Sequence, residues 1–366
     1  TVAICFPPDG AGNAYLLFWL TFIYIWWTLI HLCHIAWAAE LSDRYDERSR
    51  IQSRVLAVYF SGLLLVLTAP IAVGAIMGDT GLETKVRAMG IYAAVLLPLT
   101  VVASVFMARE KPPAPRAAAE RPMGFVEGLR LAARNPALLR LLGVDMLAGL
   151  AGGTASGLFV YVTNELFRLQ GALTIAGVAL DPGALLIFTY AGAFFGVPLW
   201  LKLSYRVGKH RAVSASALLT ILAFLYTLVM PKGDFLAAAL FYLVNGIAFG
   251  AAPFLDRAML ADVVDLDQTQ SGEQRTGFFF ALMSMTNKIG YALPVGIIFP
   301  MLDVIGFNPN GNNDPQAIAW LGAIFVGAPI TFKLLIIGLT WNFPITREMQ
   351  EALRAQLQAQ DSAPAE

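Results

Sequence analysis

Ionisable side chains inside long apolar stretches are the residues of this sequence that could do chemistry. Lys288 lies near the middle of the apolar stretch 276–302, and Asp145 lies about two turns inside the stretch 138–163. A charge at the centre of a bilayer costs about 2.5–3.5 kcal/mol on insertion scales, so it normally faces a cavity or has a partner. We interpret Lys288 as a contact for a solute or an ion. The alternative is a structural pair with Asp145 or Asp256.

Three further polar groups lie inside apolar stretches. Lys333 is nearer the middle than the end of the stretch 317–341, where it either lines a cavity or extends toward the membrane surface. His31 and His34 are three residues apart and therefore share one helix face. Such a pair can hydrogen-bond a polar solute or carry a proton, and the alternative is a packed pair. A metal site is disfavoured because no third ligand lies near in the sequence, so no cofactor is expected.

Acidic residues follow the apolar stretch 235–255. We expect Asp256 to close this stretch at its cytoplasmic end. Asp262, Asp265 and Asp267 come next, and they are either functional or part of a solvated helix end.

The elements that must position these residues are apolar stretches of about twenty residues. Of the 366 residues, 57% are hydrophobic and 14% are charged, which excludes an ordinary soluble enzyme and a nucleic-acid binder. About twenty apolar residues form a helix that crosses the hydrocarbon core. We predict an all-α membrane protein with nine such helices at 14–39, 55–77, 88–108, 138–163, 183–201, 212–230, 235–255, 276–302 and 317–341.

Basic residues predict the orientation of these helices. The odd-numbered connections and the C-terminal tail carry 19 Lys and Arg, and the even-numbered connections carry 4. Positively charged connections stay in the cytoplasm, so the C-terminus is expected inside an inner (plasma) membrane and Thr1 outside. Because no export signal precedes an outside start, we expect the chain to be truncated at its N-terminus, with residues 2–6 ending a lost helix.

The longest predicted cytoplasmic connection has three predicted helices before it and six after it. Residues 1–108 form a remnant of an N-terminal bundle, and residues 109–137 form a Pro-rich linker that ends in an amphipathic helix at 125–133. Residues 138–343 form a C-terminal six-helix bundle, and residues 344–366 form a cytoplasmic tail. Two helix bundles joined by a loop are typical of transporters built from repeats.

Small residues recur at helical spacing, and catalytic motifs do not. Gly192 and Gly196, like Gly246 and Gly250, have the spacing that allows two helices to approach closely, and we interpret them as packing residues. The sequence lacks a phosphate-binding loop, a zinc-protease motif and a serine-hydrolase motif. We therefore predict that the protein is not an enzyme and that any transport is gradient-driven or passive.

Four stretches and Lys288 together resemble a known family. The stretches are AELSDRYDERSR at 39–50, MLADVVD at 259–265, GEQRTG at 272–277 and FPIT at 343–346. This set is similar to the glycoside–pentoside–hexuronide:cation symporters of the major facilitator superfamily, the group of melibiose permease. The resemblance runs along essentially the whole chain. It implies the major facilitator fold, with the nine helices equivalent to helices 4–12 of twelve.

The resemblance also implies roles for individual residues. Lys288 matches a helix-eleven lysine near the sugar and cation sites, and Ser284, one turn earlier, matches a position that contacts sugar. Arg54 falls near the family's helix-five arginine. His31 stands where melibiose permease has a functional aspartate, a departure that puts sodium coupling and a galactoside substrate in doubt. The family's cation-site aspartates would lie upstream of Thr1.

We therefore predict a secondary active transporter that couples a sugar or glycoside-like solute to Na⁺ or H⁺ by alternating access. The expected partners are this solute and the bilayer, with no nucleic acid, and the expected assembly is a monomer. The expected solute-binding residues are Lys288, His31, Arg54, Ser284, Trp37 and Asp145. The residues expected to form salt bridges between the bundles and to gate transport are Asp43, Asp46, Arg48, Arg50, Asp256, Asp262, Asp265 and Arg275. The alternatives are a lysolipid or other amphiphile transporter of the same superfamily, or an inactive fragment.

Overall fold

A computed structural model gives the fold of the chain. It describes residues 2–8, 10–40, 45–77, 82–107, 125–169, 173–175, 178–180, 182–271, 275–309, 311–346, 348–350 and 352–353. The chain forms two compact units, which we describe separately. The N-terminal unit comprises Thr1–Leu41 and Tyr59–Pro122, and the C-terminal unit comprises Ser42–Val58 and Met123–Glu366. The division between the two units falls inside one helix, between Val58 and Tyr59. The domain boundaries expected from the sequence stay a prediction.

The N-terminal unit is built from long apolar helices. These are α1 (Val2–Cys5), α2 (Asn13–Glu40), α3 (Tyr45–Met77) and α4 (Leu82–Met107), and the first fourteen residues of α3 belong to the C-terminal unit. Along α2 the candidate span Asn13–His34 has none of its residues buried in the protein. Large apolar side chains such as Leu17 and Phe18 are exposed there, as expected of a helix surrounded by lipid.

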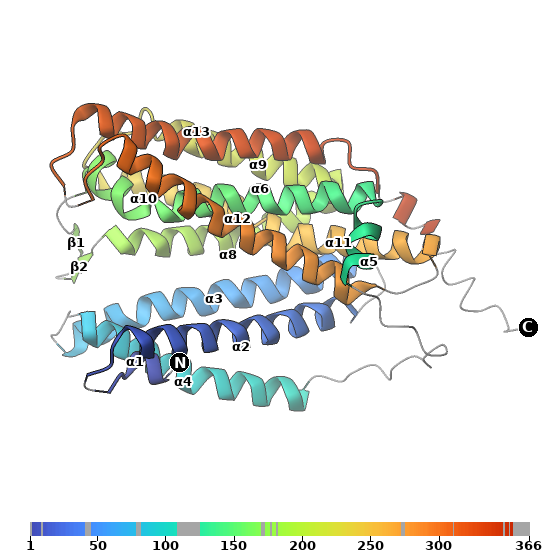
Figure 1. Cartoon of the computed structure of the whole chain (residues 1–366), viewed down its shortest axis with the longest axis horizontal. Helices are drawn as coiled ribbons and strands as arrows, with labels where there is room; N and C mark the ends of the chain where they lie inside the picture. Colours follow the sequence, from blue (N-terminus) through green and yellow to red (C-terminus); the bar gives the residue numbers. More distant parts are fainter. Residues whose placement is uncertain are drawn as a thin grey trace, which may run out of the picture. The chain divides into compact units, whose positions relative to one another are not determined.

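The C-terminal unit holds the remaining elements (Figure 1). Its helices are α5 (Phe125–Ala132), α6 (Pro136–Gly157), α7 (Phe159–Tyr161), α8 (Leu185–Val207), α9 (Lys209–Tyr226), α10 (Phe235–Phe249), α11 (Ala252–Ser271), α12 (Thr276–Val304) and α13 (Pro315–Thr340). The short π-helical turn η1 (Val162–Leu166) follows α7, and the 3₁₀ turn η2 (Pro182–Ala184) precedes α8. Strands β1 (Leu173–Ile175) and β2 (Val178–Leu180) pair antiparallel, with Leu173 opposite Leu180. Apart from this short hairpin, the described elements are helical, as the predicted all-α fold class requires.

Each of the nine predicted apolar stretches overlaps a helix, but the count of nine membrane spans is not confirmed. Seven helical segments of the described chain are long and apolar enough to cross a membrane. Helices α9 and α12 form where spans were expected and are not among these seven. One boundary was wrong: the stretch 235–255 is not one helix, because α10 ends at Phe249 and α11 begins at Ala252. Pro253 lies in the first turn of α11, a position where the missing N–H of proline interrupts no hydrogen bond within the helix.

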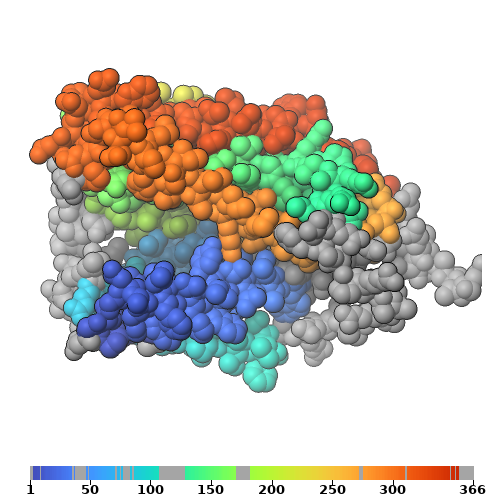
Figure 2. All heavy atoms as spheres, in the orientation of Figure 1, coloured from blue at the N-terminus to red at the C-terminus, as the bar shows by residue number. Residues whose placement is uncertain are grey.

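Close backbone contacts between helices hold the C-terminal unit together. A Cβ atom on Gly192 or Gly196 of α8 would collide with the carbonyl oxygens of Leu243 or Ile247 on α10. The indole N–H of Trp200 adds a 2.6 Å hydrogen bond to Ile247 O across the same contact. The predicted packing role of these glycines is confirmed. Helix α6 packs in the same unit against α12 and α13, and Figure 2 shows α6 in green between α12 in orange and α13 in red.

Candidate functional site

The contact between α6 and α12 positions the acidic residue of α6. Gly149 and Gly290 face each other, because a Cβ on Gly149 would lie 3.0 Å from Gly290 Cα. A Cβ on Gly153 would lie 2.6 Å from Tyr291 O. Small residues at these positions bring the two backbones together, as in other membrane helix pairs. Asp145, one turn before Gly149, is thereby placed directly against the polar residues that precede Lys288.

Asp145 is buried, and each of its carboxyl oxygens has a partner on α12. The side chain is 7% exposed. Asn287 Nδ2 donates to Asp145 Oδ1 at 3.1 Å. Thr286 Oγ1 lies 3.2 Å from Asp145 Oδ2 and 2.9 Å from the carbonyl oxygen of Met283. The sequence predicted a polar role for Asp145 but did not identify Thr286 and Asn287 as its partners.

Asp256 is a second carboxylate in the same unit. It lies in the second turn of α11 and is 2% exposed, so the expectation that it closes a span is wrong. Its Oδ1 atom accepts no hydrogen bond from the described residues. Asp145, Lys333 and Arg257 are near enough to interact with it electrostatically. Asp256 is therefore a buried acid in a mixed-charge environment, although no cation forms a direct ion pair with it within the described part of the chain.

Lys288 and Ser284 lie one turn apart on α12, and both are half-buried. Lys288 follows Asn287 directly, so its side chain leaves the helix about 100° away from the face that meets Asp145. Neither Asp145 nor Asp256 pairs with Lys288 in the described structure, and the alternative that proposed this pairing is wrong. Lys288 instead engages other groups of the protein.

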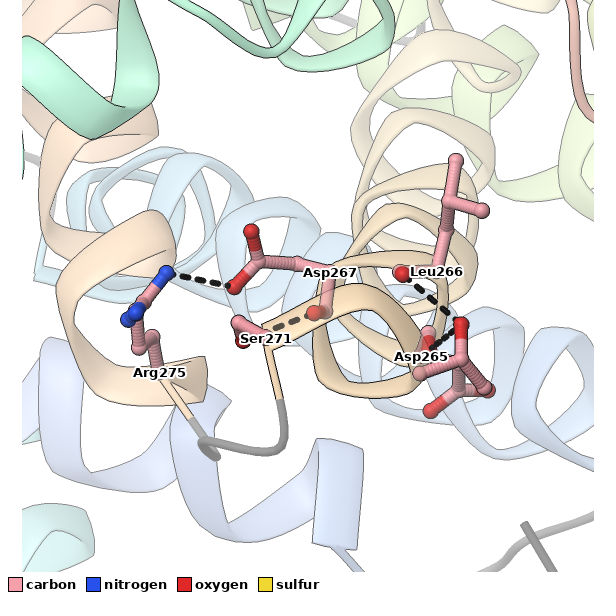
Figure 3. A network of polar contacts seen from close by, with 6 residues as sticks. Asp265, Leu266, Asp267, Ser271 and Arg275 are labelled. Carbon is pink, nitrogen blue, oxygen red and sulfur yellow. Dashed lines mark hydrogen bonds and ion pairs between the residues drawn. The ribbon is translucent and has the colours of Figure 1, made fainter.

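The second half of α11 carries a row of buried polar contacts. Lys209 Nζ donates to Asp262 Oδ2 at 2.7 Å, with both side chains at most 4% exposed. Gln350 Nε2 donates to Asp265 Oδ2 at 2.6 Å. Arg275 lies on the next helix boundary and reaches back to Asp267 at 3.2 Å, as Figure 3 shows.

These contacts of the α11 acids lie inside the C-terminal unit. The expected salt bridges between two bundles therefore stay a prediction. Sequence reasoning missed Lys209 and Gln350 as partners, because both are far from α11 in the chain. A signal that could have pointed to Lys209 is its place in the basic cluster of Arg206, Lys209 and Arg211.

Apart from Asp43, the remaining predicted site residues lie on α2 and α3. His31 stacks on Trp27, with ring centroids 5.6 Å apart, and His34 contacts Trp37 edge-on at 6.3 Å. Arg54 is exposed. On α3, Arg50 forms an exposed pair with Glu47 at 3.7 Å. Asp43 lies outside the described residues, and so do the side chains of Asp46 and Arg48.

Comparisons with known proteins relate the whole chain to membrane transporters. An uncharacterized symporter of Synechocystis sp. is 31% identical over 267 residues, which cover 68% of this chain and 45% of that protein. The sodium-dependent lysophosphatidylcholine symporter 1 of Xenopus tropicalis is 22% identical over 97% of this chain and 73% of that protein. A glucuronide carrier protein homolog of Escherichia coli is 24% identical over 51% of this chain and 41% of that protein.

The chain thus spans about half the length of the Synechocystis protein that it matches. A family model described as MFS/sugar transport protein matches residues 1–347. This match covers nearly the whole sequence and every helix described above. The chain therefore belongs to the MFS/sugar transport protein family and is a multi-pass membrane protein with the helical fold of that superfamily.

Proposed function

We propose that this protein is a secondary active transporter that moves a sugar or glycoside-like polar solute together with a cation. The main observation that supports this proposal is the family match over residues 1–347. Relatives named as symporters and as a glucuronide carrier homolog support the same activity. Transporters of this architecture bind solute near the bilayer midplane and expose the site alternately to the two sides.

The polar groups of α12 support a solute site in the C-terminal unit. Lys288 and Ser284 share one face of α12 and are half-buried, so part of each side chain remains accessible to a solute. Asp145 contacts the neighbouring face of α12, where it accepts a hydrogen bond from Asn287. We propose that Lys288 and Ser284 contact the hydroxyl groups of the solute, with Asp145 close by. His31, Trp37 and Arg54 are proposed as the contributions from α2 and α3, where an aromatic ring can stack on a sugar.

Several features of the whole transporter belong to the same proposal. The protein has nine membrane helices equivalent to helices 4–12 of twelve, works as a monomer in the plasma membrane and keeps its C-terminus in the cytoplasm. The coupling ion is Na⁺ or H⁺. Charged residues at 43–50 and 256–275 form the gate on the cytoplasmic side, through salt bridges that hold the outward-open state.

The direct test of the site is a binding measurement on the purified full chain. Scintillation-proximity binding of labelled β-glucuronides and galactosides is compared between the wild type and Lys288→Gln. The proposal predicts saturable glycoside binding that Lys288→Gln abolishes. Lys202→Gln is the matched control, because Lys202 is an exposed lysine at the end of α8 and should bind normally. Saturable binding that survives Lys288→Gln would exclude Lys288 from the site, and no binding of any glycoside would contradict the substrate class.

A lysolipid is the second candidate substrate. The observation that favours it is the likeness to a sodium-dependent lysophosphatidylcholine symporter along 97% of this chain. In this case Lys288 would meet the phosphate of the headgroup, a pairing that a lysine makes as a point charge. A competition assay with a bound fluorescent lysolipid decides between the two substrate classes. If the substrate is a lysolipid, lysophosphatidylcholine should displace the fluorescent probe and glucuronides should not.

A further inference from the structure

The hydroxyl group of Thr286 lies near two oxygen atoms and has one proton to donate. Its Oγ1 lies 2.9 Å from Met283 O and 3.2 Å from Asp145 Oδ2. A backbone carbonyl can only accept, and it is the usual partner of a threonine three or four residues later in a helix. The shorter distance to Met283 O favours this carbonyl as the acceptor of the threonine proton. The contact with Asp145 then needs a proton from the carboxyl group.

The other oxygen of Asp145 completes the pattern of a neutral acid. Asn287 Nδ2 donates to Oδ1 at 3.1 Å, so this oxygen acts as an acceptor. A protonated carboxyl group has one oxygen that accepts and one O–H that donates. The two contacts on α12 match these two roles. An ionised carboxylate would instead accept at both oxygens, and Thr286 would have to turn its one proton from Met283 O toward Asp145.

The charges around Asp145 favour the same state. Arg257 on α11 is near enough to interact electrostatically with both Asp145 and Asp256, and Lys333 on α13 with Asp256. Two cations therefore act on Asp256 and one on Asp145, and neither acid has a direct ion pair in the described structure. An ionised group in an apolar interior is costly without a paired counter-charge.

The other charged groups on the helices packed around α6 are already engaged. Lys209 on α9 pairs with Asp262 of α11, and Lys288 on α12 leaves the helix beside Asn287 and has its own contacts.

We propose that Asp145 is a proton-binding site of the C-terminal unit. Its carboxyl O–H donates a hydrogen bond to Thr286 Oγ1, the Thr286 hydroxyl donates to Met283 O, and the second carboxyl oxygen accepts from Asn287. A metal cation would need several oxygen ligands at once, and both oxygens of Asp145 are already engaged. If the protein is the proposed symporter, it follows that the proton at Asp145 is the coupling ion. Only this consequence rests on the proposed function.

Infrared spectroscopy of the purified full chain in lipid vesicles tests the site without any transport. The wild type should show the carbonyl-stretch band of a protonated carboxylic acid at neutral pH, and this band should disappear as the pH is raised. Asp145→Asn should remove the band, Asp256→Asn should keep it, and Thr286→Val should shift it because the acceptor is lost. Added Na⁺ at constant pH should leave it unchanged. A wild type without this band, or a band that Asp145→Asn leaves intact, would overturn the site.

Thermal stability provides a second measurement, because the uncharged Asn side chain in Asp145→Asn has the shape of a protonated aspartate. The amide oxygen can accept from Asn287 and the amide N–H can donate to Thr286. The proposal predicts an unchanged thermal midpoint for Asp145→Asn and a lower one for Asp145→Leu. A lower midpoint in Asp145→Asn as well would indicate that the native group is an anion and would contradict the proposal.

The consequence for coupling has its own readout. Solute accumulation driven by an imposed pH gradient should be lost in Asp145→Asn and retained in Lys202→Gln, the exposed control on α8. Accumulation that survives in Asp145→Asn would overturn the coupling role. If the wild type moves no solute at all, the proposed function fails, and the infrared band still decides whether Asp145 binds a proton.

Discussion

A buried ion pair at the start of α9 provides the first prediction at the scale of single residues. Lys209 and Asp262 lie 2.7 Å apart and are almost fully enclosed. Removing one partner leaves the other charge buried and unpaired, which costs about 3–5 kcal/mol. Lys209→Met should therefore lower the thermal unfolding midpoint strongly. Thermal unfolding of the purified protein measures the effect.

The double variant and an exposed pair control this prediction. Lys209→Met combined with Asp262→Leu should recover much of the lost stability, because an apolar pair replaces the charges. Arg87→Ala breaks the exposed pair with Glu83 and should change stability by less than about 1 kcal/mol. Equal effects of Lys209→Met and Arg87→Ala would show that burial of the pair contributes nothing.

The sequence predicted which residues are chemically unusual but not how they pair. Asp145 and Lys288 stand out because a charge in an apolar stretch is costly, and this cost is visible without a structure. Their partners depend on which helix faces meet, and that is decided by the glycines of α6 and α12. Asp145 consequently meets Thr286 and Asn287 rather than Lys288.

At the scale of elements, the α8–α10 contact depends on glycine. A Cβ on Gly246 would collide with the backbone carbonyl of Thr189, which cannot move without moving α8. Gly246→Ala should destabilise the protein by about 1–3 kcal/mol, the usual cost of overpacking. Gly296→Ala on α12 is the matched control, because no atom lies within 4 Å of its added Cβ. It should be neutral or slightly stabilising, since alanine favours a helix over glycine. A harmless Gly246→Ala would contradict the close contact.

The segment after α13 packs on the C-terminal unit through polar and apolar contacts. Gln350 is 0% exposed and donates to Asp265, and Phe343 and Ile345 in the same segment are buried as well. Gln350→Glu would place a carboxylate against Asp265 and should release the segment by repulsion. Faster hydrogen exchange of residues 343–353 would report the release. The exposed Met349→Ala should exchange as the wild type does, and unchanged exchange in Gln350→Glu would exclude a role for this bond.

Helix existence was easier to predict from the sequence than helix boundaries. Every predicted apolar stretch overlaps a helix, because length and continuous hydropathy decide where a membrane helix can form. The break between α10 and α11 was missed because the residues on both sides of Pro253 remain apolar. Asp256 was consequently assigned to a helix end instead of to the interior of α11.

At the scale of the whole molecule, two kinds of observation agree. The family match extends along residues 1–347, and the described C-terminal unit holds buried carboxylates and half-buried cations in otherwise apolar helices. Buried ionisable groups of this kind mark the ion and solute pathways of transporters. The central claim is that the protein couples movement of a polar solute to a cation gradient.

Accumulation of labelled glycosides in proteoliposomes tests this claim most directly. Vesicles with the full chain are given either an inward proton gradient or an inward Na⁺ gradient, and protein-free vesicles serve as the control. The account predicts accumulation of a glucuronide or related glycoside above equilibrium under the proton gradient, with collapse when a protonophore is added. Equilibration without accumulation under either gradient, or movement of lysophosphatidylcholine alone, would contradict it.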